Sequence, residues 1–547
     1  MAGINSRDFL DELRYDLKVK DLLKAKIVLS SLSEVDEQTI KKAYFELGQA
    51  DHGFTIHLLA DLNGENNDLF NKFPVLKEIF FSKVIDNTEL IVNMLKNGSK
   101  PHELSYLAQV AGEMGLDAAV PALLKILSEK KDEYVLESVI NALGDIGDPS
   151  ATAAVGEFLY CEQANLIRAT IKTLGDLGTP TAMRRLGEKI GDDRELDEII
   201  LGIFARHQSP EALIELNKTL SSQFAFVRSL GKKMLVQIGE KAVPYLIKNI
   251  HINDPDLQIH SLNVLGDIND ETAISEIRKL IHNHPQDANV RFAAYEALGK
   301  LPLHKGAYVL AAGLQDPEDN VRTAAAGAID RNYDDILSAG IKNMIRDEGA
   351  ESLNIIRTII NSQCDRVFLS LLDEEVFKKY GLPYLAEKAH PDIRSHFKTL
   401  LLSTGYNDLI ENYFDKTKIE REEKLKVYAI DDSKMVLNIF RTILHDLGYD
   451  PCLFEFPEQA LTQIRRERPA AILTDLNMPD ISGIELAKQM REIYNKDELP
   501  IIMVTTQKDT LDKVAAYAAG INIIIHKPFT EEQINKALLD VGIRPTD

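Results

Sequence analysis

The sequence predicts a multidomain chain in which an all-α repeat solenoid is followed by an α/β domain with a doubly wound, five-stranded parallel sheet. Two observations predict this order. A Leu-Gly-Asp signature at the end of an amphipathic segment returns every 30 to 33 residues through the middle of the chain. After residue 425, short β-rich apolar runs alternate with helical stretches, which is typical of parallel βαβ units.

The repeat is clearest in two copies of one heptapeptide. Leu-Gly-Asp-Ile-Gly-Asp-Pro at 143–149 returns 31 residues later as Leu-Gly-Asp-Leu-Gly-Thr-Pro at 174–180. Each copy predicts two helices, the first starting after the proline and the second ending at a glycine. Since one repeat cannot bury its apolar face alone, neighbouring repeats are expected to stack into a solenoid.

These patterns divide the chain into five segments. Residues 1–100 are expected to form degenerate or capping repeats, 101–333 about eight regular repeats, and 334–418 further helices of the solenoid. The charged run at 419–426 predicts a linker, and residues 427–547 the α/β domain.

Composition limits the functions that are plausible. The 547 residues carry a formal charge of −22, which argues against a nucleic-acid partner because such binding depends on Lys and Arg. Three cysteines without metal or redox spacing suggest reduced thiols and a cytoplasmic location. The charged N-terminus does not resemble a secretory signal, and no apolar run approaches the roughly 18 residues of a membrane span.

The period and the helix-pair pattern resemble HEAT-like repeats, particularly the short bilin-lyase type. This resemblance implies a scaffold with an extended surface for an unknown protein target. It also leaves open an enzyme of the bilin-lyase type.

Polar residues follow four of the five predicted strands, which are Val427–Ile430, Cys452–Phe454, Ala471–Thr474, Ile501–Thr505 and Ile521–Ile525. In a doubly wound sheet, ligands bind at the carboxyl ends of the strands, so these groups are expected to meet at one edge. They are Asp431 and Asp432, Asp475, Thr505 and Thr506, and Lys527.

The chemistry of this set suggests a cation and a phosphoryl group. Three crowded carboxylates raise one another's pKa unless a cation neutralises them, and an all-oxygen set suits Mg²⁺. A lysine ammonium and a threonine hydroxyl can bind phosphoryl oxygens. The plainer interpretation is that the aspartates are solvated or that Asp432 and Ser433 cap the next helix.

The C-terminal segment resembles the response-regulator receiver family, CheY-like domains with a flavodoxin-like strand order. The resemblance is carried by Asp431-Asp432-Ser433, Asp475 with Met478-Pro479, Gly483, Thr505 and Lys527-Pro528.

The resemblance assigns a role to each of these positions. Asp475 would be the phosphoacceptor, and Asp432 and Asp475 would hold Mg²⁺ together with the backbone carbonyl of Asn477. Asp431 would act on the metal through water or an indirect contact. Thr505 and Lys527 would contact the phosphoryl oxygens, and the Lys527–Pro528 peptide is expected to be cis.

The resulting hypothesis is a two-component signalling protein. A histidine kinase or phosphotransfer protein would phosphorylate Asp475, and the phosphorylated state would regulate protein contacts made through the repeats. The protein would be no enzyme apart from its own dephosphorylation. A constitutive scaffold with a non-signalling receiver is the remaining alternative.

The route from the acceptor to the output departs from the family pattern. Ile524 occupies a position that is often aromatic in the family, so a change at Thr505 would have to be transmitted by packing. Residues 509–519, 521–525 and 530–539 are the predicted contact surface for the solenoid or an outside partner.

Overall fold

The computed structural model describes residues 6–65, 69–98, 100–129, 131–303, 308–414, 424–478, 481–506 and 510–545. The chain divides into two compact units, Met1–Glu215 and Leu216–Asp547, and each is described by itself. Most of the predicted linker at 419–426, together with Pro479 and Asp509, lies outside the described residues. Among the helices described, none combines the length and the apolar character needed to cross a membrane.

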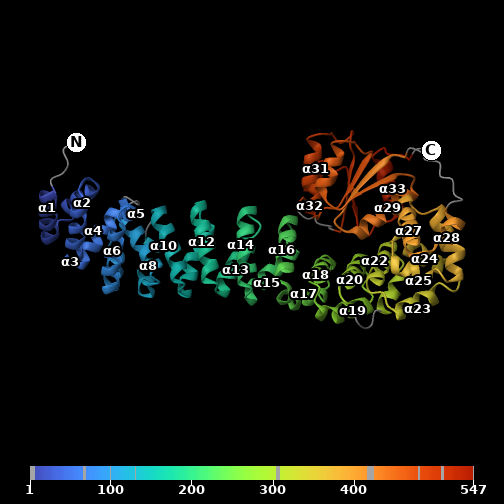
Figure 1. The fold of residues 1–547 in the computed structure, drawn as a ribbon, viewed down its shortest axis with the longest axis horizontal. Helices are drawn as coiled ribbons and strands as arrows, with labels where there is room; N and C mark the ends of the chain where they lie inside the picture. The colour runs from blue at the N-terminus through green and yellow to red at the C-terminus, as the bar shows by residue number, and fades with distance from the viewer. Residues whose placement is uncertain are drawn as a thin grey trace. The chain divides into compact units, whose positions relative to one another are not determined.

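The first unit is helical throughout its described residues, as the repeat pattern predicts (Figure 1). Its helices are α1 (Ser6–Val19), α2 (Leu22–Ser30), α3 (Glu37–Gln49), α4 (His52–Glu65), α5 (Leu69–Lys72), α6 (Pro74–Asp86), α7 (Thr88–Asn97), α8 (Pro101–Glu113), α9 (Val120–Glu129), α10 (Glu133–Ile146), α11 (Thr152–Gly156), α12 (Ala164–Leu177), α13 (Pro180–Glu188) and α14 (Arg194–His207). Helix α15 (Pro210–Lys218) spans the boundary between the units.

The helical part of the second unit continues the pattern of helix pairs. Its helices are α16 (Ala225–Ile238), α17 (Val243–Ile250), α18 (Pro255–Ile268), α19 (Ile274–His282), α20 (Ala288–Lys300), α21 (Tyr308–Ala312), α22 (Asp319–Arg331), α23 (Asp335–Met344), α24 (Ala350–Asn361), α25 (Asp365–Leu371), α26 (Leu382–Glu387), α27 (Pro391–Thr404) and α28 (Asn407–Tyr413).

The glycine of the Leu-Gly-Asp signature lets successive repeats approach closely. A Cβ added to Gly112 in α8 would lie 2.9 Å from the Cα of Ala142 in α10. A Cβ on Gly266 in α18 would lie 3.0 Å from the Cα of Ala297 in α20. A side chain at either position would therefore push two backbones apart.

The second glycine of the heptapeptide ends the helix. Gly147 follows α10 with φ 78° and Gly178 follows α12 with φ 60°, the left-handed conformation of a helix C-cap. Gln208 takes the same conformation after α14, with φ 50°. The repeat therefore keeps this backbone turn even where the glycine is lost.

The α/β part of the second unit is a parallel sheet with the strand order β2-β1-β3-β4-β5, which confirms the predicted doubly wound fold. Its strands are β1 (Lys426–Ile430), β2 (Asp450–Phe454), β3 (Ala471–Thr474), β4 (Ile501–Thr505) and β5 (Ile523–His526). The connecting helices are α29 (Lys434–Asp446), α30 (Pro457–Ile464), α31 (Gly483–Arg491), α32 (Thr510–Ala518) and α33 (Glu531–Asp540).

The last strand was predicted two residues too early. It begins at Ile523, because Ile521 and Asn522 still belong to the connection from α32. The backbone amide of Ile521 donates to the Ala516 carbonyl, and that of Asn522 to the Ile501 carbonyl at the start of β4. The apolar run begins before the chain has reached its register in the sheet.

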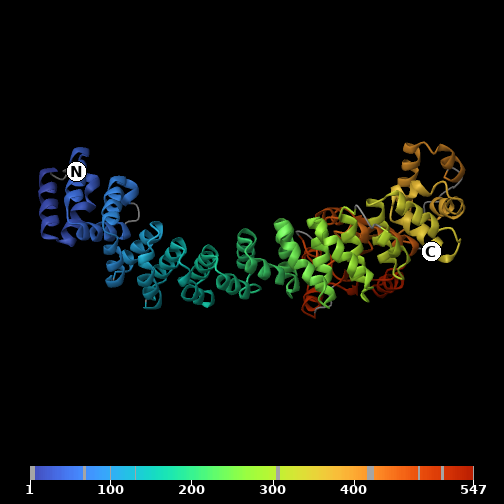
Figure 2. The ribbon, with the colours of Figure 1, turned by 90° about the horizontal axis from the view of Figure 1, so that it is seen from below.

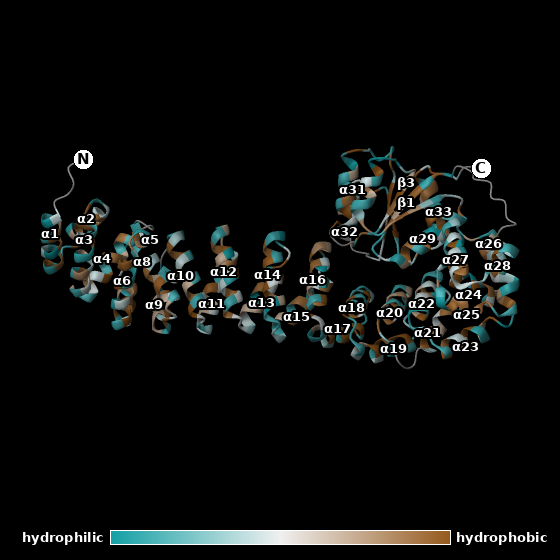
Figure 3. Cartoon of the chain, in the orientation of Figure 1, coloured by the Kyte–Doolittle hydropathy of each residue, from teal (hydrophilic) through white to brown (hydrophobic). Residues whose placement is uncertain are grey.

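Two apolar cores cover the two faces of the sheet, and the strands form a hydrophobic centre in Figure 3. One core includes Phe440 of α29, which stacks on Phe529 with ring centroids 4.9 Å apart. The other includes buried residues of α30, α31 and α32, such as Ile464, Leu486 and Ala516. The carboxyl edge of the sheet stays free for polar groups.

Candidate functional site

The strand register brings the predicted aspartates together. Ile430 and Thr474 are paired in the sheet, so Asp431 and Asp475 leave neighbouring strands at the same level. The amide of Asp475 still donates to the Ile430 carbonyl at 3.0 Å. Both side chains are buried, with 1% of Asp431 and 8% of Asp475 exposed.

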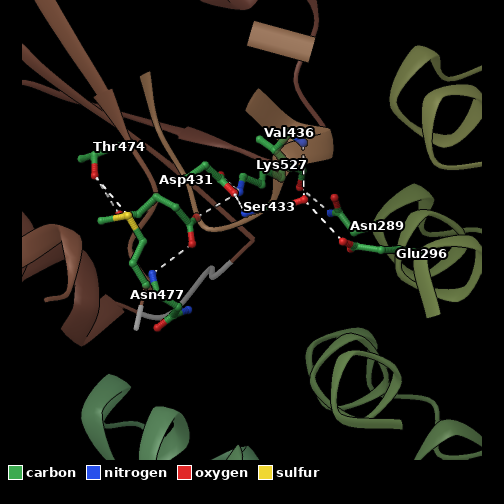
Figure 4. A network of polar contacts seen from close by, with 10 residues as sticks. Asn289, Glu296, Asp431, Ser433, Val436, Thr474, Asn477 and Lys527 are labelled. Carbon is green, nitrogen blue, oxygen red and sulfur yellow. Dashed lines mark hydrogen bonds and ion pairs between the residues drawn. The ribbon is translucent and has the colours of Figure 1, made fainter. Parts of the chain in front are cut away.

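Lys527 joins these two carboxylates (Figure 4). Its Nζ donates to Asp431 Oδ2 at 2.6 Å and lies 3.1 Å from Asp475 Oδ1. The Lys527 amide donates to the Thr505 carbonyl at 2.8 Å, which holds the start of the loop against β4. The Lys527–Pro528 peptide is cis, as expected.

Backbone amides orient the remaining carboxylate oxygens. The amide of Asn477 donates to Asp475 Oδ2 at 3.0 Å, and the amide of Ser433 donates to Asp431 Oδ1 at 2.9 Å. Each of these two aspartates is therefore held in place from both sides.

Asp432 is different from the other two aspartates. Ser433, and not Asp432, caps α29, through its Oγ and the Val436 amide. Within the described residues, the Asp432 side chain has no hydrogen bond or ion pair, and it lines the pocket at the site. It is therefore available to a ligand that enters the pocket.

The electrostatics of the site favour an added cation. Burial and the neighbouring Asp475 carboxylate raise the pKa of both Asp431 and Asp432 above the ordinary value. Burial opposes the charge of Lys527, but Asp431 and Asp475 outweigh it and raise the pKa of that ammonium. Asp431 and Asp475 thus share one buried ammonium while Asp432 adds a third carboxylate beside them, an arrangement that a divalent cation would neutralise.

The donor set fits Mg²⁺, although the side chains do not already form a ligand cluster. In the described parts of the chain, no group of three His, Cys, Asp or Glu side chains stands in metal-binding geometry. Asp432 is unpartnered there, Asp475 lies beside it, and Asn477 lines the same pocket. These are oxygen donors of the kind that Mg²⁺ prefers.

The threonines occupy different environments. Thr505 ends β4 and is buried, with 3% of the residue exposed. Thr506, the next residue, lines the pocket. Sequence analysis placed both at this edge but assigned a role only to Thr505. Ile524 is half-buried and packs against the core that contains α30 to α32.

The site has a second wall that sequence analysis missed. Residues of the repeat helices α16, α18, α20 and α22 line the same pocket of about 120 Å³. They include Lys232, His260, Asn289, Phe292, Glu296 and Asn320. Asn289 Nδ2 donates to the Lys527 carbonyl, and Ser433 Oγ lies 3.4 Å from Glu296 Oε1 (Figure 4).

Family models match both kinds of architecture. The response regulator receiver domain model matches residues 427–539. The HEAT repeat model matches residues 88–172, 120–199 and 243–330, so its first match begins before the predicted boundary at residue 101.

Individual proteins resemble the C-terminal segment. A chemotaxis protein CheY homolog of Campylobacter jejuni is 35% identical over 119 residues, which are 21% of this chain and 92% of that protein. The structure of chemotaxis protein CheY4 of Vibrio cholerae is 32% identical and covers 21% of this chain and 98% of its own, with a TM-score of 0.21. A sensor histidine kinase receiver domain from Pseudomonas aeruginosa, described with magnesium in its active-site cleft, is 26% identical and covers 22% of this chain and 98% of its own, with a TM-score of 0.21.

Proposed function

Because this chain belongs to the response-regulator receiver family through residues 427–539, we propose that it is a two-component signalling protein that accepts a phosphoryl group on Asp475. The observation that carries this proposal is the position of Lys527. Its ammonium lies 3.1 Å from Asp475 Oδ1 and 2.6 Å from Asp431 Oδ2 at the carboxyl edge of the sheet.

The proposed reaction is the transfer of a phosphoryl group from a histidine nitrogen to an aspartate oxygen. The P–N bond of a phosphohistidine on a kinase or phosphotransfer protein breaks, and a P–O bond forms to an Asp475 carboxylate oxygen. The Asn477 amide holds Oδ2 of Asp475, which fixes the carboxylate plane. Lys527 forms an ion pair with the phosphoryl oxygens, and the hydroxyl of Thr505 or Thr506 donates a hydrogen bond to them.

Mg²⁺ would be held by Asp432 and Asp475 with the Asn477 carbonyl, and would neutralise the phosphoryl oxygens during transfer. Asp431 would remain paired with Lys527 and keep that ammonium aimed at Asp475. Water attack on the acyl phosphate would break the P–O bond, release inorganic phosphate and return Asp475 to its carboxylate, and this is the only catalysis that we propose.

The repeats would carry the output through contacts with a protein target. A constitutive scaffold is disfavoured because the acceptor, its ammonium and an unpartnered aspartate occupy one pocket. No observation at the repeats favours a bilin-lyase activity.

The test is labelling of the full chain with radioactive acetyl phosphate. We expect Mg²⁺-dependent, acid-stable and hydroxylamine-labile label that Asp475→Asn abolishes. Asp497→Asn is the matched control, since Asp497 is an exposed loop aspartate of the same domain. Full labelling of Asp475→Asn, or unchanged labelling in excess chelator, would contradict the proposal.

A further inference from the structure

The receiver, residues 427–539, is packed against the repeats of its own unit. Helix α29 lies against α22 and α24, and Figures 1 and 2 both show the receiver beside these helices. Arg441 Nη1 of α29 donates to Gln363 Oε1 at 3.3 Å, and His445 meets His390 with ring centroids 4.8 Å apart. Phe292 of α20 packs against the apolar core on this side of the sheet.

This packing places not only α29 but also the carboxyl edge of the sheet, which holds Asp431, Asp432 and Asp475, against the repeats. Asp431, Asp432 and Asp475 line one side of the pocket, and residues of α16, α18, α20 and α22 line the other. Its volume of about 120 Å³ is enough for several water molecules, and therefore for small oxyanions and hydrated cations.

Lys232 is the cation that the repeats bring to this pocket. It lies one turn after Arg228 on α16, is half-buried, and makes no ion pair or side-chain hydrogen bond within the described residues. Burial lowers the pKa of Lys232 to about 8, while the nearby Asp432 and Asp475 carboxylates act in the opposite direction. The acidic groups that act most strongly on Lys232 are thus Asp432 and Asp475 of the receiver.

The other groups on this wall do not replace Lys232. Burial and the charges of Lys232 and Arg228 lower the pKa of His260 well below its ordinary value, so this imidazole is neutral. Glu296 is acidic and faces Ser433. Asn289 already donates to the Lys527 carbonyl. Among these lining groups, Lys232 alone can add positive charge.

Phosphorylation increases the need for such a charge. A phosphoryl group adds about −1.5 to −2 charges at neutral pH. Lys527 is already shared between Asp431 and Asp475. We propose that Lys232 of the repeats is a second lysine ligand of the phosphoryl group, an inference that rests on the proposed function. The phosphoryl site is then complete only when the receiver is docked on α16 to α22.

The consequence is a coupling between phosphorylation and docking. A phosphoryl group bound from both walls holds the receiver against the repeats more tightly than the bare carboxylate does. By linkage, docking must favour the phosphorylated state by the same factor. The repeats then respond to phosphorylation of Asp475 by direct contact, and no aromatic side chain is needed at the position of Ile524.

The test uses beryllofluoride with Mg²⁺ on the full chain, followed by fluorine NMR. We expect Lys232→Met to weaken beryllofluoride binding about tenfold or more, because a hydrogen bond to a charged group contributes about 1.5–3 kcal/mol. Lys233→Met is the matched control, since Lys233 is exposed on the same helix. Lys232→Arg keeps the charge and should bind within threefold of the wild type.

A second readout separates direct binding from general damage. In the wild type, beryllofluoride should slow hydrogen exchange in α16 and α18, and this protection should disappear in Lys232→Met while α10 and α12 exchange as before. Retention of both affinity and protection in Lys232→Met would overturn the inference and leave Asp475 as the acceptor. An equal loss in Lys232→Arg would also overturn it, since charge would not be the cause.

Failure of the proposed function has a different signature. Asp475→Asn is expected to abolish beryllofluoride binding. If the wild type and Asp475→Asn behave alike, the acceptor assignment fails and the role of Lys232 fails with it.

Discussion

The repeats and the receiver use the same ion pair in opposite surroundings. Lys300 and Asp267 bridge α20 and α18 at 2.7 Å, with 36% and 47% of their side chains exposed. Lys527 and Asp431 are 2.6 Å apart, with 13% and 1% exposed. Water can replace the partners of the first pair, whereas the second pair is buried together with Asp475 and is held by the Ser433 amide, which donates to Asp431. The difference separates an exposed ion pair, which contributes little to stability, from a buried one, whose partners depend on each other.

The largest expected effect comes from breaking the buried pair. Lys527→Met should destabilise the receiver by about 3–5 kcal/mol at pH 8, because two buried carboxylates lose their counter-charge. Burial raises the pKa of Asp431, so protonation at low pH removes the uncompensated charge and the loss should be smaller at pH 5. Hydrogen exchange of β1 and β3 measures the free energy of opening.

The matched control breaks the exposed pair. Lys300→Met should change the opening free energy of α18 and α20 by at most about 1 kcal/mol. Equal losses in the two variants, or a Lys527→Met effect that grows toward pH 5, would contradict the comparison.

A smaller effect is expected where two helices of neighbouring repeats approach each other closely at a glycine. Gly112→Ala should destabilise the first unit by about 1–3 kcal/mol, since the new Cβ would lie 2.9 Å from the Ala142 backbone. Gly202 is the control: it is also inside a helix, α14, but a Cβ there meets nothing within 4 Å. Gly202→Ala should stabilise by about 0.5–1 kcal/mol. Thermal melts of the two variants should move in opposite directions, and a shift in the same direction would show that close packing is not what the signature requires.

A further effect concerns pH and arises at the carboxylates of the receiver. Because the pKa values of Asp431 and Asp432 are raised in the folded state, the metal-free receiver should lose stability as the pH rises through those values. Protons compete with Mg²⁺ for the same oxygens, so the apparent Mg²⁺ affinity should fall by up to about tenfold for each pH unit below the raised pKa. Calorimetric titrations at pH 5, 6, 7 and 8 check this, and a flat profile would contradict the ligand assignment.

The parts of the fold that depend on local patterns were predictable from the sequence. The signature glycines and helix ends gave the repeats, and β3 and β4 were predicted at their observed bounds. The predicted β5 ended one residue too early and started two residues too early. Ile521 is apolar because it packs in the core, although it does not pair in the sheet. Apolar character alone does not reveal the register of a strand.

The meeting of Asp431, Asp475 and Lys527 at the carboxyl edge of the sheet was also predictable, since each of them follows a strand. The wall of repeat residues was not. Lys232 and Lys233 are adjacent in the sequence, and no pattern distinguishes the lysine that meets the pocket from its exposed neighbour. That distinction arises from docking between segments more than 190 residues apart, a property of tertiary structure.

The hydrogen bond between Asn289 and the Lys527 carbonyl has a consequence for how this gene can recombine. It joins positions separated by 238 residues, so the two ends of the contact are encoded far apart in the same reading frame. A recombination event that exchanged this receiver for a homologous one would preserve the carboxylates and the lysine but replace the surface that meets α20. Such a chimera would keep the carboxylates and the lysine without a surface that fits α20, so the receiver and the repeats that it contacts are expected to be inherited together.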